Sequence, residues 1–201
     1  MSTGYFLDTI DRSFTDVHLT GPEQHIDTRE FLEAAQAVVQ MFEILGATAF
    51  LAVIKDMNGN IAKIRTKYLT SPTTLDSLQK IILAEKAEKT TTATQGLLWL
   101  KRGLEFTCKA LRHNVANPTV ELDTSFNTAY GETLRNYHNF IIRGVFAVAM
   151  KACPTRAYFY EKLGPDYATV EKQLVEWLAA LENIIAILNA FYASGNYDKG
   201  L

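Results

Sequence analysis

Three polar residues within the stretch "KDMNGNIAKI", residues 55–64, have the types and spacing of a binding row. If the stretch is helical, Asp56, Asn60 and Lys63 stand at positions i, i+4 and i+7 and share one face. The row would then offer a carboxylate acceptor, an amide that both donates and accepts, and a cationic donor. That combination suits a ligand rich in hydroxyl or amide groups.

The middle of this stretch conflicts with a helix. Asn58, Gly59 and Asn60 together cost about 2 kcal/mol relative to alanine inside a helix, and Asn-Gly pairs often mark turns. A solvated turn is therefore the alternative interpretation. If the stretch is helical, its poor helix formers indicate a functional site, and Gly59 is expected to let a neighbouring element or a ligand come close.

Two ring-bearing residues further along could extend such a site. Trp99, in "LLWLKRG", could present its face to the apolar side of a sugar ring. His138, in "RNYHNFIIRG", could hydrogen-bond a ligand carbonyl. The alternatives are a core tryptophan and a structural, hydrogen-bonded histidine.

Signatures of catalysis and of metal binding are missing from the sequence. It contains no G-x-S-x-G, P-loop or G-x-G-x-x-G motif, and no E-x-x-H or H-E-x-x-H pattern. Asp56 and His138 could form an acid–base dyad, but no spacing places a nucleophile beside them. We expect no enzyme activity, no cofactor and no metal. Cys108 and Cys153 are isolated, which favours core thiols in a reduced, intracellular chain.

The elements that must position these residues are expected to be helices. Apolar residues recur with helical spacing, and Gly or Pro stop signals separate the segments. Strand-like alternation is nearly absent, so we expect one all-α domain over residues 1–201, arranged in two layers. The expected helices cover residues 27–46, 47–71, 73–89, 93–114, 123–152, 155–164 and 168–194.

Composition restricts the partners of the chain. Hydrophobic residues make up 48% of it, which is enough for one large core, and a net charge of −2 argues against nucleic acid as a partner. No window of 18 apolar residues predicts a membrane-spanning helix, and "MSTGYFLDTIDRSF" lacks the apolar region of a signal peptide. We expect a cytoplasmic monomer that meets membranes only transiently, from the aqueous side.

Three motifs in order along the chain resemble the glycolipid transfer protein family. They are "LGATAFLAVIKDMNGNIAKI", with a D-x-x-G-N-x-x-K pattern; "GLLWLKRGLEF", with W-L-K-R-G-L; and "NYHNFIIRGVFAVAMKACP", with Y-H followed by A-x-P. The match runs along most of the chain. The chain is similar to the fungal heterokaryon-incompatibility members of that family.

The resemblance implies a two-layer, all-helical fold that encloses one membrane lipid. In that family an Asp bonds the ceramide amide nitrogen and a His bonds the amide carbonyl. An Asn and a Lys bond sugar hydroxyls, and a Trp stacks under the first sugar. The matching residues of this chain are Asp56, His138, Asn60, Lys63 and Trp99.

A carrier of this kind needs an apolar cavity more than it needs polar contacts. A two-chain lipid exposes ~30 methylenes at about 0.8 kcal/mol each, whereas each head-group hydrogen bond contributes roughly 1 kcal/mol. Our candidates for the pocket lining are Phe50, Val53, Ile54, Val145, Phe146, Ala149, Ile184 and Leu188. The candidates for membrane docking are Phe140, Tyr158, Lys101, Arg102 and Arg143.

Three alternatives remain on the same residues. A ceramide-1-phosphate carrier would need extra cations where Trp99 and Asn60 stand. A signalling module would bind the glycolipid without transferring it in bulk, and a hydrolase would turn it over.

One departure from the family pattern concerns a second lysine that helps hold an outer sugar. It falls near Lys89 or Thr90 after a shortened loop, which weakens any expectation for long head groups.

Overall fold

The computed structural model describes residues 4–201 and is built almost entirely of helices, which confirms the expected all-α class. The two described strands pair antiparallel in one short hairpin near the N-terminus. The elements in chain order are α1 Phe6–Thr9, the 3-10 helix η1 Phe14–Asp16, β1 Leu19–Thr20, β2 His25–Ile26, α2 Thr28–Gly46, α3 Leu51–Thr70, α4 Leu78–Glu88, α5 Thr92–Ala116, α6 Leu122–Glu132, the 3-10 helix η2 Leu134–Tyr137, α7 Phe140–Lys151, α8 Arg156–Leu163 and α9 Tyr167–Gly195.

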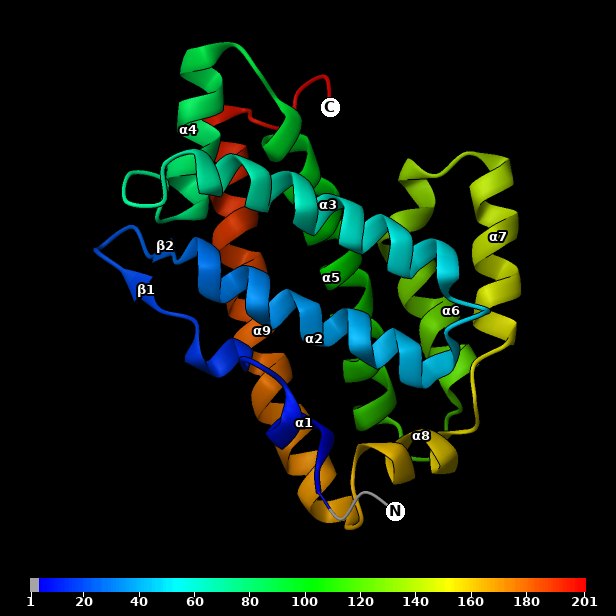
Figure 1. The fold of residues 1–201 in the computed structure, drawn as a ribbon. Coiled ribbons are helices and arrows are strands. Elements are labelled where there is room, and N and C mark those ends of the chain that lie inside the picture. The colour runs from blue at the N-terminus through cyan, green and yellow to red at the C-terminus, as the bar shows by residue number, and fades with distance from the viewer. Residues whose placement is uncertain (1–3) are drawn as a thin grey trace.

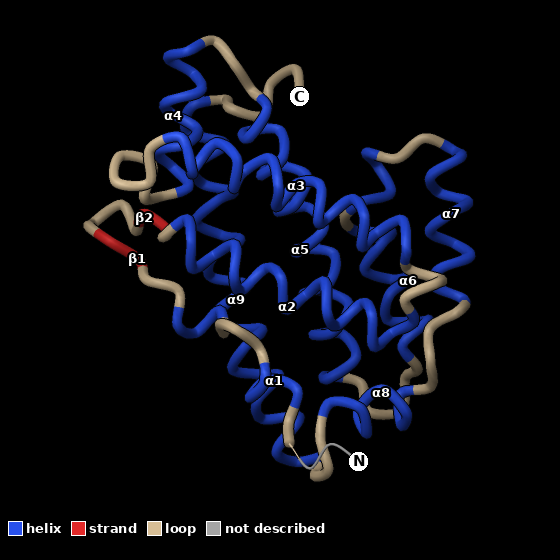
Figure 2. Tube along the Cα trace, in the orientation of Figure 1, coloured by secondary structure: helices blue, strands red, loops and turns tan. Residues whose placement is uncertain are grey.

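The helices pack in two layers. α2 and α3 run side by side across one face, and α5 and α9 lie behind them (Figure 1). α6 packs on α5, and α7 lies beyond α6 at one edge of the molecule. Figure 2 shows that loops are mostly confined to the ends of the helices. Four phenylalanines join the layers, with neighbouring ring centroids 5.2 to 6.3 Å apart: Phe42, Phe50, Phe106 and Phe126.

α3 continues without a break through the Asn-Gly-Asn sequence. Met57, Ile61 and Ile64 are buried on its inner face, at positions i, i+4 and i+7. Burying such side chains contributes roughly 1.5–3 kcal/mol each, which exceeds the cost of the poor helix formers. The helical interpretation of residues 55–64 is confirmed, and the turn is excluded.

The close approach between helices occurs at Gly96, and no neighbouring element approaches Gly59 as the sequence had suggested. Apart from its chain neighbours and the nearby backbone of its own helix, a Cβ atom on Gly59 would meet no atom within 4 Å. A Cβ on Gly96 of α5 would lie 3.2 Å from the Lys63 Cβ and 3.3 Å from the Asn60 carbonyl oxygen. The missing side chain at Gly96 therefore allows α5 to lie directly against the polar row of α3.

The single helix expected over residues 123–152 is wrong, because the chain breaks between α6 and α7. Thr133 leaves helical geometry with ψ −87°, and His138 is extended with φ −99° and ψ 134°. The Asn139 side chain then accepts the Ile142 N–H at 3.1 Å and starts α7 as its N-cap. Because of this break, His138 lies in an extended segment between two helices and not on a helix face.

α9 is long and apolar enough to cross a membrane by length and composition alone, and an 18-residue window of it has a mean hydropathy of 1.6. In this structure one side of it is packed into the core. Leu174, Trp177, Leu181 and Leu188 are buried, and the Trp177 ring lies 5.2 Å from that of Phe14. Core packing thus accounts for the apolar character of the packed side of this helix.

Removing the Glu85 side chain should destabilise the start of α5. The buried Glu85 carboxylate accepts the Ala93 N–H at 2.9 Å, the Thr94 N–H at 2.7 Å and the Thr94 hydroxyl at 2.8 Å. Glu85→Ala would leave these buried donors unpaired, so we expect a loss of about 3 kcal/mol in the free energy of unfolding. Urea denaturation measures it. Glu88→Ala, which removes an exposed carboxylate on the same helix, is the control and should lose less than about 1 kcal/mol. Equal losses would refute the capping role.

Candidate functional site

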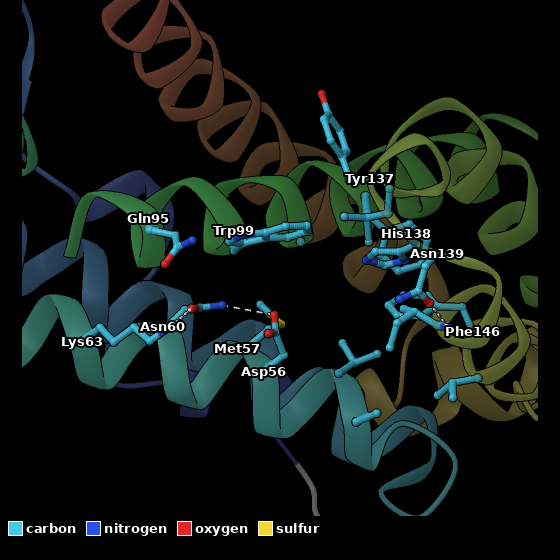
Figure 3. Close-up of a pocket in the computed structure, with 17 residues that line it drawn as sticks. Asp56, Met57, Asn60, Lys63, Gln95, Trp99, Tyr137, His138, Asn139 and Phe146 are labelled. Carbon is cyan, nitrogen blue, oxygen red and sulfur yellow. Dashed lines mark hydrogen bonds between the residues drawn. The ribbon is translucent and has the colours of Figure 1, made fainter. Parts of the chain in front are cut away.

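A recess of about 500 Å³ opens between α3, α5, η2 and α7, and all five residues of the expected head-group site line it (Figure 3). The lining residues are Ala52, Val53, Asp56, Met57, Asn60, Lys63, Gln95, Trp99, Gly103, Phe106, Leu134, Tyr137, His138, Asn139, Ile142, Val145 and Phe146.

The polar row on α3 forms one wall of the recess. The Asn60 amide donates to the Asp56 carboxylate at 3.1 Å, and the Lys63 ammonium donates to the Asn60 amide oxygen at 3.4 Å. Partial burial raises the pKa of Asp56, while the nearby Lys63 charge opposes that shift. The carboxylate is thus incompletely solvated and has capacity for another donor, because a carboxylate accepts up to about four hydrogen bonds.

The rings of Trp99 on α5 and of His138, the residue after η2, form the opposite wall (Figure 3). The Trp99 and His138 rings stack with centroids 6.1 Å apart and an interplanar angle of 12°. The Arg102 guanidinium lies 3.7 Å from the Tyr137 ring centroid and 4.8 Å from that of Trp99. These cation–π contacts fix the position of the indole. Trp99 therefore lies across the recess from the α3 row.

His138 is held by a residue that the sequence did not single out. Its Nδ1 lies 3.1 Å from the Tyr130 hydroxyl. Burial raises the pKa of Tyr130, and burial together with the Arg143 charge lowers the pKa of His138. A protonated tyrosine beside a neutral imidazole donates to Nδ1, so we assign the His138 proton to Nε2. His138 can then donate one hydrogen bond to a carbonyl acceptor.

The part of the recess formed by the start of α3 and by α7 is apolar, and some of its lining was expected. Val53, Val145 and Phe146 contribute to it. Five other candidates do not line this recess and are buried in the core instead: Phe50, Ile54, Ala149, Ile184 and Leu188. The reason is visible at Phe50, whose ring packs against the core rings of Phe42 and Phe126.

The docking candidates fall into two groups. Phe140 is 82% exposed, and Tyr158 and Arg143 are also exposed. Lys101 is buried: its ammonium donates to the Asn189 side chain and lies over the Tyr192 ring. Burial lowers the pKa of Lys101.

Two of the basic candidates, Lys101 and Arg102, therefore contact other side chains of the protein. Lys101 lies on the side of α5 that packs against α9, so the structure contradicts a surface role for it. Arg102 is only partly exposed, and its guanidinium lies over the Trp99 and Tyr137 rings.

Several lining residues were missed by the sequence analysis. Gln95 lies one helical turn before Trp99 and faces the same recess, a spacing that could have revealed it. Tyr137 and Asn139 enter the recess only because the chain breaks between α6 and α7. Within residues 4–201, no group of three His, Cys, Asp or Glu side chains is placed to hold a metal ion.

Comparisons with known proteins agree on one family. The family model described as "Glycolipid transfer protein (GLTP)" matches residues 26–165. A glycolipid transfer protein of Aureobasidium melanogenum is 49% identical over 191 residues, which is 95% of this chain and 94% of that protein.

Two solved structures share the fold closely. The fungal glycolipid transfer protein HET-C2 superposes with a TM-score of 0.90 at 44% identity, over 94% of this chain and 96% of that one. A structure described as showing how FAPP2 selects simple glycosphingolipids using the GLTP fold gives a TM-score of 0.89 at 35% identity. That match covers 96% of this chain and 97% of the other.

The neutral state of His138 predicts how stability changes with pH. Its folded pKa is lowered below the ordinary 6.5, so between these two values the unfolded chain binds more protons than the folded one. The His138 contribution to stability therefore falls as the pH drops from 6.5 towards the folded pKa. NMR titration of the His138 ring should give a midpoint below 6.5, and His138→Gln should flatten this part of the stability profile. A midpoint at or above 6.5 would contradict the assignment.

Proposed function

The chain belongs to the glycolipid transfer protein family, and we propose that it extracts one glycosphingolipid from a membrane, shields it from water and delivers it to another membrane. One observation carries this proposal. A single recess combines a polar row and a ring wall with an apolar part formed by the start of α3 and by α7. That division matches the amphipathic character of a glycosphingolipid.

The ceramide amide is the part of the ligand that the site recognises most specifically. Asp56 accepts the amide N–H, and His138 donates its Nε2–H to the amide carbonyl. Asn60 and Lys63 bond hydroxyl groups of the first sugar, whose apolar face stacks on Trp99. Support for these roles comes from the positions of all five side chains around one recess.

The ceramide chains require more space than the recess offers. A volume of about 500 Å³ is typical of sites for drug-sized ligands, and a lipid with ~30 methylenes is larger. We propose that the chains enter past Phe146 and displace core side chains such as Ile54 and Ala149. This displacement gives those sequence-predicted residues a lining role in the loaded protein.

The charge of the recess favours a sugar over a phosphate head group. Among the described lining residues Lys63 is the cationic side chain, and Asp56 lies two positions away along the same row, beyond Asn60. A phosphate would gain one partner and meet one carboxylate, whereas sugar hydroxyls can use both groups. A neutral monohexosyl ceramide should therefore compete better than ceramide-1-phosphate for transfer of a labelled glycolipid.

We propose transfer without chemical turnover, by a monomer that stays in the cytoplasm and touches membranes transiently. Labelled glycolipid recovered intact after incubation would support this over hydrolysis. A variant that binds glycolipid but does not transfer it would distinguish a sensing role from a transfer role. If such a variant still produces the cellular response, the protein acts as a sensor.

Replacing Asp56 by valine should abolish most glycolipid uptake. The variant loses a charged acceptor that contributes roughly 1.5–3 kcal/mol to a hydrogen bond, so binding should weaken about tenfold to a hundredfold. Folding should be nearly unaffected, because Asp56 is an exposed residue that belongs to no ion pair recorded for residues 4–201, and its carboxylate accepts one recorded side-chain hydrogen bond, from Asn60. Vesicle-to-vesicle transfer and circular dichroism measure the two effects. Thr66→Val, an exposed change on the same helix, is the control, and equal transfer by both variants would contradict the role of Asp56.

Replacing Phe140 by alanine should weaken membrane docking. The side chain is 82% exposed on the first residue of α7, where burial in a bilayer would contribute roughly 1.5–3 kcal/mol. We expect vesicle partitioning and transfer rate to fall about tenfold. Leu69→Ala removes another exposed apolar side chain, on α3, and should change neither. Unchanged partitioning of the Phe140 variant would remove this residue from docking.

A further inference from the structure

A second concavity lies between α6, η2 and α7, behind the Tyr130–His138 pair. It has a volume of about 350 Å³. Its lining residues are Asn127, Tyr130, Gly131, Arg135, Arg143, Ala147 and Met150. We call it the arginine groove. Because Tyr130 lines the groove and bonds His138, these two rings separate it from the glycolipid recess.

Two guanidinium groups line the groove without a carboxylate partner. Neither Arg135 nor Arg143 takes part in an ion pair recorded for residues 4–201. The nearby Glu132 carboxylate instead lies 3.8 Å from the Lys109 ammonium. Two like charges in one concavity repel each other, and an anion placed between them would relieve that repulsion.

The guanidinium of Arg143 is already anchored. Its Nε donates to the Arg135 backbone carbonyl at 3.1 Å, which ties α7 to η2 and leaves its two terminal nitrogens free for a ligand. Both arginine charges also act on the Tyr130 hydroxyl, so their fields converge at the floor of the groove. The groove is therefore positive and partly ordered before any ligand arrives.

The side of α7 next to the groove is apolar and exposed. Phe140, Ile141 and Val148 are 82%, 62% and 69% exposed, and α7 lies at the edge of the molecule (Figure 1). Arg143 stands one helical turn after Phe140. When such a face rests at the boundary between acyl chains and head groups, the adjacent arginines lie at the level of the lipid phosphates.

We propose that the arginine groove binds the phosphomonoester head group of an anionic membrane lipid while α7 rests on the bilayer. This inference rests on the proposed function for the docking of α7. A phosphomonoester presents three terminal oxygens and up to two negative charges, so two guanidinium forks can each pair with it. A phosphodiester has only two such oxygens and one charge. The groove thus selects donor or acceptor membranes by a lipid that is not the cargo.

The test compares vesicles of phosphatidylcholine alone with vesicles that also contain phosphatidic acid, a phosphomonoester lipid. A third set carries phosphatidylserine, a phosphodiester, at equal surface charge, and inorganic phosphate is added as a soluble competitor. We expect the unchanged protein to bind phosphatidic acid vesicles at least about tenfold more tightly than either other set, given two guanidinium contacts. Arg135→Gln/Arg143→Gln should lose this preference.

A double variant with the same change in charge provides the matched control. Arg29→Gln/Lys172→Gln removes two exposed cations on α2 and α9 and should keep the preference. Equal losses in both double variants would reduce the effect to net charge and overturn the proposal. So would equal binding to phosphatidylserine, or full inhibition by inorganic phosphate at concentrations that leave the lipid in excess.

The same vesicles also test the proposed function separately, by the transfer of labelled glycolipid between them. If the unchanged protein moves labelled glycolipid between phosphatidylcholine vesicles but shows no preference for phosphatidic acid, only the arginine groove is refuted. If it moves no glycolipid between any vesicles yet binds phosphatidic acid through the two arginines, the proposed function fails and the groove stands.

Discussion

The close contact between α3 and α5 at Gly96 determines the geometry of the whole recess. It brings the backbone of α5 within contact distance of Asn60 and Lys63, so the row on one helix lies opposite Trp99 on the other. A wider separation would leave the polar groups and the ring on two independent surfaces. The buried carboxylate of Glu85 supports the same contact, because it fixes where α5 begins.

Apolar burial and hydrogen bonding make different contributions to ligand binding at the site. Apolar burial supplies most of the free energy for holding a two-chain lipid, and it is indifferent to the identity of the head group. The few hydrogen bonds contribute far less but are directional, so they discriminate between lipids. His138 illustrates this, since the Tyr130 hydroxyl determines which of its two nitrogens can donate.

Periodicity was sufficient to predict most helices and the binding row, whereas local propensity was misleading in one place and periodicity in another. The Asn-Gly-Asn run in α3 suggested a turn, but buried Met57, Ile61 and Ile64 outweigh local propensity. The helix expected over residues 123–152 is interrupted because the Asn139 cap competes with helical continuation, an effect that apolar spacing does not reveal.

The sequence predicted which side chains are buried better than it predicted which of them line a cavity. Lys101 follows Trp99 by two residues and therefore lies on another side of α5, where it is buried against α9. Phe50 and Ile184 are as apolar as Phe146, yet the structure packs them in the core. Sequence patterns distinguish core from surface, but they do not distinguish a packed interior from a lining that opens for a ligand.

The most direct test of the account is native mass spectrometry of the protein after incubation with vesicles containing equal amounts of a neutral monohexosyl ceramide and ceramide-1-phosphate. We expect a complex of one protein with one intact glycosphingolipid. A complex with ceramide-1-phosphate in preference, or with a ceramide that has lost its sugar, would contradict it.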